Sequence, residues 1–197
     1  MDAMEAIMTR RSTRKMKPDP LPRALVEQVI EAGRAAPSGG NSQTTRFIVI
    51  TCRETLSDLA RLVEKAFAAM ELKPGLYRSL QNSIAASKRG GYVFHYGAPL
   101  LILTANKADY GNAMADSACA LENMMIAANA LDLGSCWINQ PHWLTDDREV
   151  RACLEELGLE KDETVTGGLI LGWPDTEDGL PNRAPLPRTG NPVVWLE

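Results

Sequence analysis

Apolar residues recur at helical spacing in five stretches of the chain, separated by prolines, glycines and polar turns. The first stretch follows Asp2, a residue suited to the N-cap position. Its expected apolar stripe consists of Met4, Ile7 and Met8. The pattern predicts helices just after Asp2 and at residues 21–36, 54–70, 113–131 and 145–157.

Short, nearly continuous apolar runs lie between these helices and predict buried strands. The runs are Phe47–Ile50, Leu100–Leu103, Ser135–Ile138 and Thr164–Trp173. Helices and strands alternate irregularly, without regular βαβ units, which favours an α+β fold. Residues 174–197 are rich in proline and predict an extended arm that ends in a strand at 193–196.

The helix at 113–131 is apolar around most of its circumference, because only Asp116 and Glu122 carry charge. Such a helix must be covered on all sides, and one small domain covers about 30 Å of it with difficulty. Its many alanines also allow another helix to approach closely. The helix is therefore expected at a subunit interface or at the domain centre, with a dimer favoured. Gly134 is the expected stop signal after it.

Residues 73–97 give a weaker signal, because Pro74-Gly75, Gly90-Gly91 and Gly97 interrupt scattered aromatic residues. This composition favours a lid or pocket rim over a core element, and ordinary surface loop is nearly as good an interpretation. The candidate substrate-contacting side chains are Tyr77, Tyr92, Phe94, His95 and, further along the chain, Trp143.

The length and charge of the chain exclude several kinds of partner and site. A chain of 197 residues suits a single domain, and a net charge of −4 argues against nucleic acid or an anionic membrane as partner. No apolar run reaches membrane-spanning length, and no signal-peptide core follows the N-terminus. Four scattered cysteines are typical of a reducing cytoplasm, and with only two histidines no metal site is expected.

Against this acidic background, Arg10-Arg11-Ser12-Thr13-Arg14 forms a local basic cluster. In an extended segment Arg10, Ser12 and Arg14 would point to one side. That side would offer guanidinium and hydroxyl donors to an anion, most naturally a phosphate. The alternative is a solvated basic run near a terminus.

Ordinary catalytic sets are missing from the sequence. There is no Walker A loop, no G-x-G-x-x-G after a strand and no G-x-S-x-G elbow. Thr145 is the expected cap of the last helix, so Asp146-Asp147 is better explained by the start of that helix than by a catalytic pair. Cys136, in an apolar strand, is expected to be a buried, inert thiol. Such a protein can still be an enzyme if a cofactor carries the reaction.

Four motifs together resemble the FMN-dependent nitroreductase family. They are Arg10-Arg11-Ser12-Thr13-Arg14, the loop Pro37-Ser38-Gly39-Gly40-Asn41-Ser42-Gln43, Leu133-Gly134-Ser135-Cys136-Trp137-Ile138, and Gly168-Leu169-Ile170-Leu171-Gly172-Trp173-Pro174. They stand in the family's order and span nearly the whole chain. One departure is Thr44-Thr45, where many members of the family carry Pro-Trp.

The resemblance implies a single α-β-α sandwich domain over residues 1–197, with a mostly antiparallel sheet. It also implies an obligate homodimer with FMN at the interface and the arm at 174–197 exchanged between subunits. Segment 73–97 would shape the substrate pocket. The implied cofactor-binding residues are Arg10, Arg11, Ser12, Arg14, Pro37, Ser38, Gly39, Asn41, Gln43, Trp137, Ile138, Asn139, Arg183 and Arg188.

Within that set, the loop at 37–43 would reach the flavin of the other subunit, and Trp137–Asn139 would offer a backbone N–H to flavin N5. Arg188 fits the family's C-terminal phosphate arginine better than Arg183 does. The strand at 193–196 would pair with the partner's sheet.

The function implied is a cytoplasmic oxidoreductase in which NADH or NADPH reduces FMN. Electrons then pass to a nitroaromatic, quinone or similar small acceptor, without a catalytic side chain. Three alternatives stay open: a flavin-binding carrier or sensor without turnover, a reductive dehalogenase or flavin-destroying relative, and a structural dimer with a surface anion patch.

Overall fold

A computed structural model describes residues 1–196, so that Glu197, at the end of the predicted arm, lies outside it. Its centre is an antiparallel sheet with the strand order β1-β2-β4-β3. The strands are β1 (Arg46–Ile50), β2 (Leu100–Lys107), β3 (Gly134–Ile138) and β4 (Glu163–Gly172). The four strands predicted from apolar runs are confirmed, and β2 runs four residues further than the prediction that ended at Leu103.

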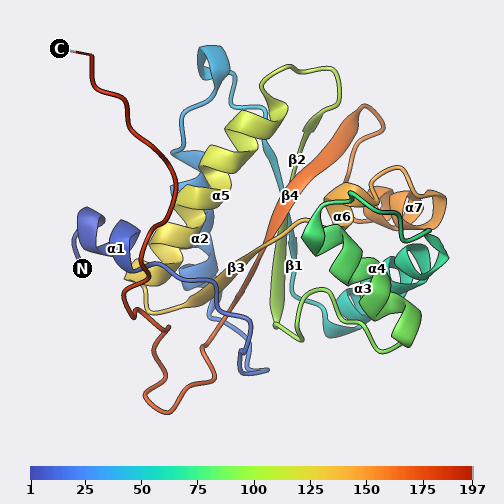
Figure 1. Ribbon diagram of the computed structural model, residues 1–197, viewed down its shortest axis with the longest axis horizontal. Helices are drawn as coiled ribbons and strands as arrows, with labels where there is room; N and C mark the ends of the chain where they lie inside the picture. The colour runs from blue at the N-terminus through green and yellow to red at the C-terminus, as the bar shows by residue number, and fades with distance from the viewer. Residues whose placement is uncertain (197) are drawn as a thin grey trace.

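Both faces of the sheet are buried, as the continuous apolar runs indicated. Along β2, Leu101 and Leu103 belong to one hydrophobic cluster and Leu100 and Ile102 to another, because successive side chains of a strand point to opposite faces. Each cluster must be covered by helices. The result is the three-layer α+β sandwich that the family resemblance implied (Figure 1).

One face is covered by α2 (Arg23–Arg34) and α5 (Ala113–Ala130), with α1 (Ala3–Thr9) packed beside α5. The other face is covered by α3 (Arg53–Ala69), α4 (Arg78–Arg89), α6 (Gln140–Trp143) and α7 (Arg148–Glu156). None of the helices described is long and apolar enough to cross a membrane.

The helix predicted at 113–131 is confirmed as α5. It buries Leu121 and Met124 against the sheet but leaves Met114, Ala115 and Cys119 exposed in the single chain. The expected stripe on α1 is wrong as a core contact, since the side chains of Met4, Ile7 and Met8 are exposed. Ala6 is the residue that α1 buries, because its carbonyl accepts a hydrogen bond from Asn129 on α5.

The interpretation of residues 73–97 as an irregular lid is partly wrong, because α4 forms within them. Ser83, Ile84 and Ser87 bury one face of this helix against the core. The glycines act as boundaries: Gly90, with a φ of 86°, is the C-cap of α4.

The predicted N-cap of the last helix is wrong. Asp147, not Thr145, caps α7, because its carboxylate accepts hydrogen bonds from the amides of Glu149 and Val150. Thr145 is buried and instead accepts the amide hydrogen of Val165 on β4. A short helix, α6, follows β3 and precedes this cap.

Gly134 does not stop α5. The left-handed residue after that helix is Asp132, with a φ of 60°. Gly134 is instead the first residue of β3, and a Cβ there would lie 2.8 Å from the Thr13 methyl group. The glycine therefore admits the N-terminal segment to the edge of the sheet.

The C-terminal segment contains no strand at 193–196 in the single chain. Figure 1 shows it running past α1 and α5 and ending away from the sheet. Its apolar tip is open, with Trp195 81% exposed. Pairing with a partner's sheet stays a prediction.

Candidate functional site

The basic segment lies along the free edge of β3. Ser12 forms a parallel bridge with Ser135, and the Thr13 amide donates to the Ser135 carbonyl at 2.8 Å. The first and third sequence motifs, more than a hundred residues apart in the chain, are thereby brought side by side. The contact depends on the missing side chain of Gly134.

A cavity of about 650 Å³ opens where this segment meets the end of β3 and the face of α4. This volume is in the range of small-molecule sites. It is lined by Ser12, Arg14, Tyr77, Ser79, Asn82, Ser83, Ala85, Ala86, Arg89, Tyr92, Tyr96, Cys136, Trp137, Ile138, Asn139, Gln140 and Trp143.

The cavity is positively charged, because its described lining contains Arg14 and Arg89 and no carboxylate. Arg14 also lies over the Tyr96 ring, 5.9 Å from its centroid. Burial raises the pKa of the Cys136 thiol, while Arg14, Ser12 and Arg10 pull that pKa down in part. Ser12 and Arg14 line the cavity, whereas Arg10 forms an ion pair with Glu122 of α5 at 3.4 Å. Two of the three side chains expected on one side of the segment therefore face the cavity.

The edge of β3 presents one backbone amide to this region. Ser135 turns its carbonyl toward Thr13, away from β4. Because amides alternate in direction along a strand, the Trp137 N–H faces the same free edge. The Asn139 amide instead donates to Gln140 Oε1 at 3.2 Å. Trp137 is thus the better backbone donor of the three residues predicted at 137–139.

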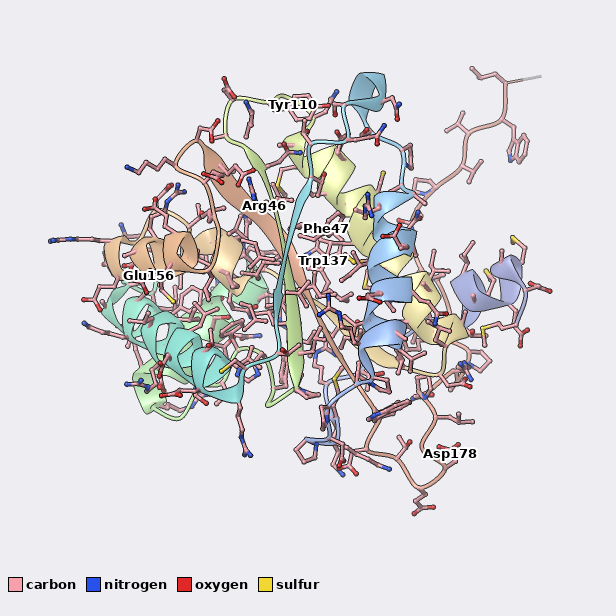
Figure 2. The ribbon with its side chains drawn as sticks, turned by 180° about the vertical axis from the view of Figure 1, so that it is seen from behind. Arg46, Phe47, Tyr110, Trp137, Glu156 and Asp178 are labelled. Atoms are coloured by element: carbon pink, nitrogen blue, oxygen red, sulfur yellow. The ribbon has the colours of Figure 1, made fainter. Side chains whose placement is uncertain are left out.

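The Trp137 side chain points the other way. Its indole packs over Gly167, where a Cβ would lie 3.4 Å from the ring, and belongs to the α5 side of the sheet (Figure 2). The missing side chain of Gly167 therefore lets the indole approach the backbone of β4 closely. Trp137 therefore contributes its backbone, rather than its ring, to the edge of the sheet.

Part of the cavity wall is a closed polar network. Gln140 Nε2 donates to the Tyr92 hydroxyl at 2.9 Å, and that hydroxyl lies 2.9 Å from Ser83 Oγ. Burial raises the pKa of Tyr92. The sequence prediction found Tyr92 but missed Ser83, Gln140, Asn82 and Arg89. Because α4 was not predicted, the spacing of Ser79, Asn82 and Ser83 on one helical face went unused.

Three of the five predicted pocket aromatics line the cavity. Tyr77 and Trp143 form an edge-to-face pair with centroids 6.1 Å apart, and Tyr92 lies in the network described above. Tyr96 also lines the cavity and was not predicted.

The other two predicted pocket residues are wrong. Phe94 is fully buried in the core, and His95, 6% exposed, faces a separate cavity beside α3. The positive φ angles of Gly90, Gly91 and Gly97 turn the chain beneath α3. The side chains of Phe94 and His95 therefore point into the interior.

The loop at 37–43 is fixed at the first turn of α5. The Gly39 amide donates to Asp116 Oδ1 at 3.0 Å, and the Tyr110 hydroxyl donates to Asp116 Oδ2 at 2.9 Å. Figure 2 shows Tyr110 at this end of the molecule. The left-handed φ of 55° at Asn41 exemplifies the tight backbone that these bonds hold.

Within one chain, this loop and the cavity are far apart. Asp116 holds the loop at the start of α5, whereas Asn129, near its end, donates to the Ala6 carbonyl of α1 at 3.0 Å. Thirteen helical residues separate the two anchors, or about 20 Å. Accordingly, Pro37, Ser38, Gly39, Asn41 and Gln43 are absent from the cavity lining.

The remaining predicted arginines are used differently. Arg11 donates from Nε to the Ala184 carbonyl at 3.0 Å and from its terminal nitrogen to two further carbonyls. Arg183 binds Asn129 and forms an ion pair with Asp132 at 2.7 Å. Both guanidiniums therefore attach the arm to the body of the chain. Arg188 is exposed.

The four cysteines are free, and Cys136 is buried as expected. In the part of the chain that the structure describes, no cluster of histidine, cysteine and carboxylate side chains is arranged to hold a metal ion.

Three known proteins illustrate what this chain is similar to. A nitroreductase of Bacteroides fragilis with bound FMN is 31% identical, with a TM-score of 0.85 over 100% of both chains. An FMN and NADPH-dependent nitroreductase of Sphigopyxis sp. strain HMH is 26% identical, with a TM-score of 0.74 and the same coverage. An NADH dehydrogenase of Thermus thermophilus is 29% identical over 99% of this chain and 96% of its own.

The family assignment rests on the length of the match as well as on these relatives. Residues 7–173 match the Nitroreductase family, and this range holds both the basic segment and the free edge of β3. The chain belongs to the nitroreductase family, as its four motifs indicated.

Proposed function

We propose that the protein is an FMN-dependent oxidoreductase that takes electrons from NADH or NADPH. It passes them to a nitroaromatic, quinone or similar electrophilic acceptor in the cytoplasm. The observation that carries the proposal is the convergence of Ser12, Arg14 and the free edge of β3 on one cavity in a chain of this family. The four free cysteines suit the reducing compartment.

The donor set fits FMN. Arg14 offers charged donors for a phosphate and Ser12 offers a hydroxyl beside it. Arg10, paired with Glu122 at 3.4 Å, is the second candidate cation of the same segment. The aromatic residues Tyr77 and Trp143 suit the stacking of a flat ring system. The Trp137 amide at the strand edge is a donor suited to a ring nitrogen.

The second half of the site comes from another copy of the chain. The proposed contacts from the partner subunit are those of the loop at 37–43, which does not line the cavity of its own chain and is anchored about 20 Å along α5 from the residue that holds α1. Arg188, on the open arm, is the remaining candidate for a phosphate contact, because Arg11 and Arg183 are already bonded to the body of the chain. The exposed face of α5 is the surface that such a dimer would cover.

FMN, when bound, supplies the two-electron chemistry between the nicotinamide and the acceptor. For a nitroarene the balance is one NAD(P)H and one proton consumed, with NAD(P)⁺, the nitroso compound and water formed. The chain's own contribution is positioning: Arg10 and Arg14 hold anionic groups, and the Gln140–Tyr92–Ser83 network keeps the cavity wall in place. The Tyr92 hydroxyl is already hydrogen-bonded to Gln140 and Ser83 in this network.

The visible spectrum of the purified protein tests the proposal. We expect a yellow protein that bleaches on anaerobic addition of NADPH or NADH and regains its colour when a nitroarene or quinone is added. A protein that stays colourless after incubation with FMN would contradict cofactor binding. A yellow protein that neither nicotinamide bleaches would instead be a carrier or sensor.

The shared site is tested by mixing two inactive variants. Arg14→Ala removes a contact of the cavity, and Asn41→Ala removes one of the distant loop. If each site takes one half from each chain, heterodimers of the two variants should contain one intact site and regain up to half of the activity per dimer. The absence of any recovery, with both variants folded and dimeric, would mean that each chain builds its own site.

A further inference from the structure

Arg89 is a cation of the cavity that the proposed cofactor contacts do not use. It lies in the last turn of α4 and lines the same cavity as Ser12 and Arg14. Its side chain is exposed, and no ion pair found among residues 1–196 involves it. An unpaired guanidinium in a cavity that lacks carboxylates attracts anions.

The face of α4 that carries Arg89 is built for a polar ligand. Ser79, Asn82 and Ser83 line the cavity at helical spacing, and the small side chains of Ala85 and Ala86 leave room before Arg89. This stripe offers hydroxyl, amide and guanidinium donors and no acid. Local positive charge of this kind is unexpected in a chain with a net charge of −4.

We propose that Arg89 binds an anionic group on the second ligand, which is the molecule that shares the cavity with the cofactor. This inference rests on the proposed function, because Arg10 and Arg14 are assigned there to the cofactor. The group that Arg89 binds is a phosphate or a carboxylate, because a guanidinium can bind either through two hydrogen bonds. Its source is the 2′-phosphate of NADPH or the carboxylate of an acidic aromatic acceptor.

The test replaces Arg89 by leucine and compares each half-reaction with a charged and an uncharged probe. Reduction of the protein by NADPH is compared with reduction by NADH. Reoxidation of the reduced protein by 4-nitrobenzoate is compared with reoxidation by 4-nitrobenzyl alcohol. Arg89→Leu should lower the preference for the charged probe about tenfold in one or both pairs, as expected for one lost charge-assisted bond.

Lys88→Leu is the matched control, because Lys88 is the exposed neighbour on the same turn and does not line the cavity. It should leave both preferences unchanged, and Arg89→Lys should retain part of them. A changed NADPH:NADH ratio identifies the phosphate as the group bound, and a changed nitrobenzoate:alcohol ratio identifies the carboxylate.

Unchanged ratios in Arg89→Leu would overturn the assignment. So would an equal loss for all four probes, or an equal shift in Lys88→Leu. These results are distinct from failure of the proposed function. In that case the wild-type protein would contain no FMN, or would not be reduced by either nicotinamide.

Discussion

Single residues of the cavity differ in whether their bonding capacity is already satisfied. Gln140 accepts from Asn139 and donates to Tyr92, so that it is occupied at both ends of its amide. Arg14 and Arg89 form no ion pair in the described structure and keep their donors for ligands. The hydrogen-bonded side of the cavity therefore keeps its shape, while the guanidiniums of Arg14 and Arg89 are available to ligands. This combination suits a site in which two ligands bind in turn.

His95 gives a prediction at the same scale. Burial lowers the pKa of its imidazole below the ordinary value of 6.5, and Nδ1 has no hydrogen-bond partner. Its folded-state pKa lies below the unfolded one, so its contribution to stability is complete above about pH 6.5 and is lost as the pH falls below that value. The wild-type free energy of unfolding should fall with decreasing pH, with His95 adding up to about 1.4 kcal/mol per pH unit.

Urea denaturation at pH values between about 5 and 7 measures this dependence. His95→Gln should make the slope shallower than that of the wild type, and flavin reduction should persist, since His95 lies outside the cavity of the site. Identical slopes in the two proteins would show that His95 is not the titrating group.

At the scale of elements, short polar contacts decide where helices begin. Asp147 and Thr145 are both good N-cap residues by type, and the sequence favoured Thr145. In the structure Thr145 is held by the amide of Val165 on β4, which leaves Asp147 to cap α7. A tertiary hydrogen bond thus moved the start of the helix by two residues.

The cap gives a direct comparison between two adjacent carboxylates. Asp147→Ala should lower the free energy of unfolding by about 1 kcal/mol, because two amides of the first turn lose their acceptor. Asp146→Ala, at an exposed position, should change it by less than about 0.5 kcal/mol. Chemical denaturation of both variants measures the difference. Equal effects would show that Asp147 is not the energetically important cap.

At the scale of the whole molecule, the chain leaves apolar surface open on one side. The exposed face of α5, the outward methionines of α1 and the tip of the arm all contribute to it. The loop that the proposed site requires is held at the start of α5 and is absent from the cavity of its own chain. The dimer proposed above, formed through α5, would account for both observations.

Thiol labelling tests this arrangement with residues already present. Cys52 and Cys119 are both exposed in the single chain, but only Cys119 lies on the open face of α5. Hydrogen bonds from Thr55 and nearby amides lower the pKa of Cys52 and favour its thiolate. In the native protein, N-ethylmaleimide should modify Cys52 at least ~10-fold faster than Cys119, with both modified after unfolding.

Mass spectrometry of timed samples reads out this order of labelling. Cys136 is the internal reference, because it is buried and its pKa is raised. Rapid native labelling of Cys119 would contradict a dimer that covers α5.

The elements with strong periodicity were predictable, and so was the family. The four strands and the helices α2, α3 and α5 lie within a few residues of their predicted bounds, since each carries a long apolar pattern. Helix α4 was missed because its buried face includes Ser83 and Ser87, which do not register as apolar. Phe94 and His95 were misplaced because glycine turns, not residue type, direct them into the interior.

The sequence by itself determined the α+β layers, the membership of the nitroreductase family and the basic segment at residues 10–14. These features depend on residue type and local order, which the chain carries directly. Only the tertiary structure decided that Arg11 and Arg183 attach the arm, that the edge amide is that of Trp137, and that Arg89 faces the cavity. The reason is physical: direction and distance between remote segments are fixed by packing, and no local pattern encodes them.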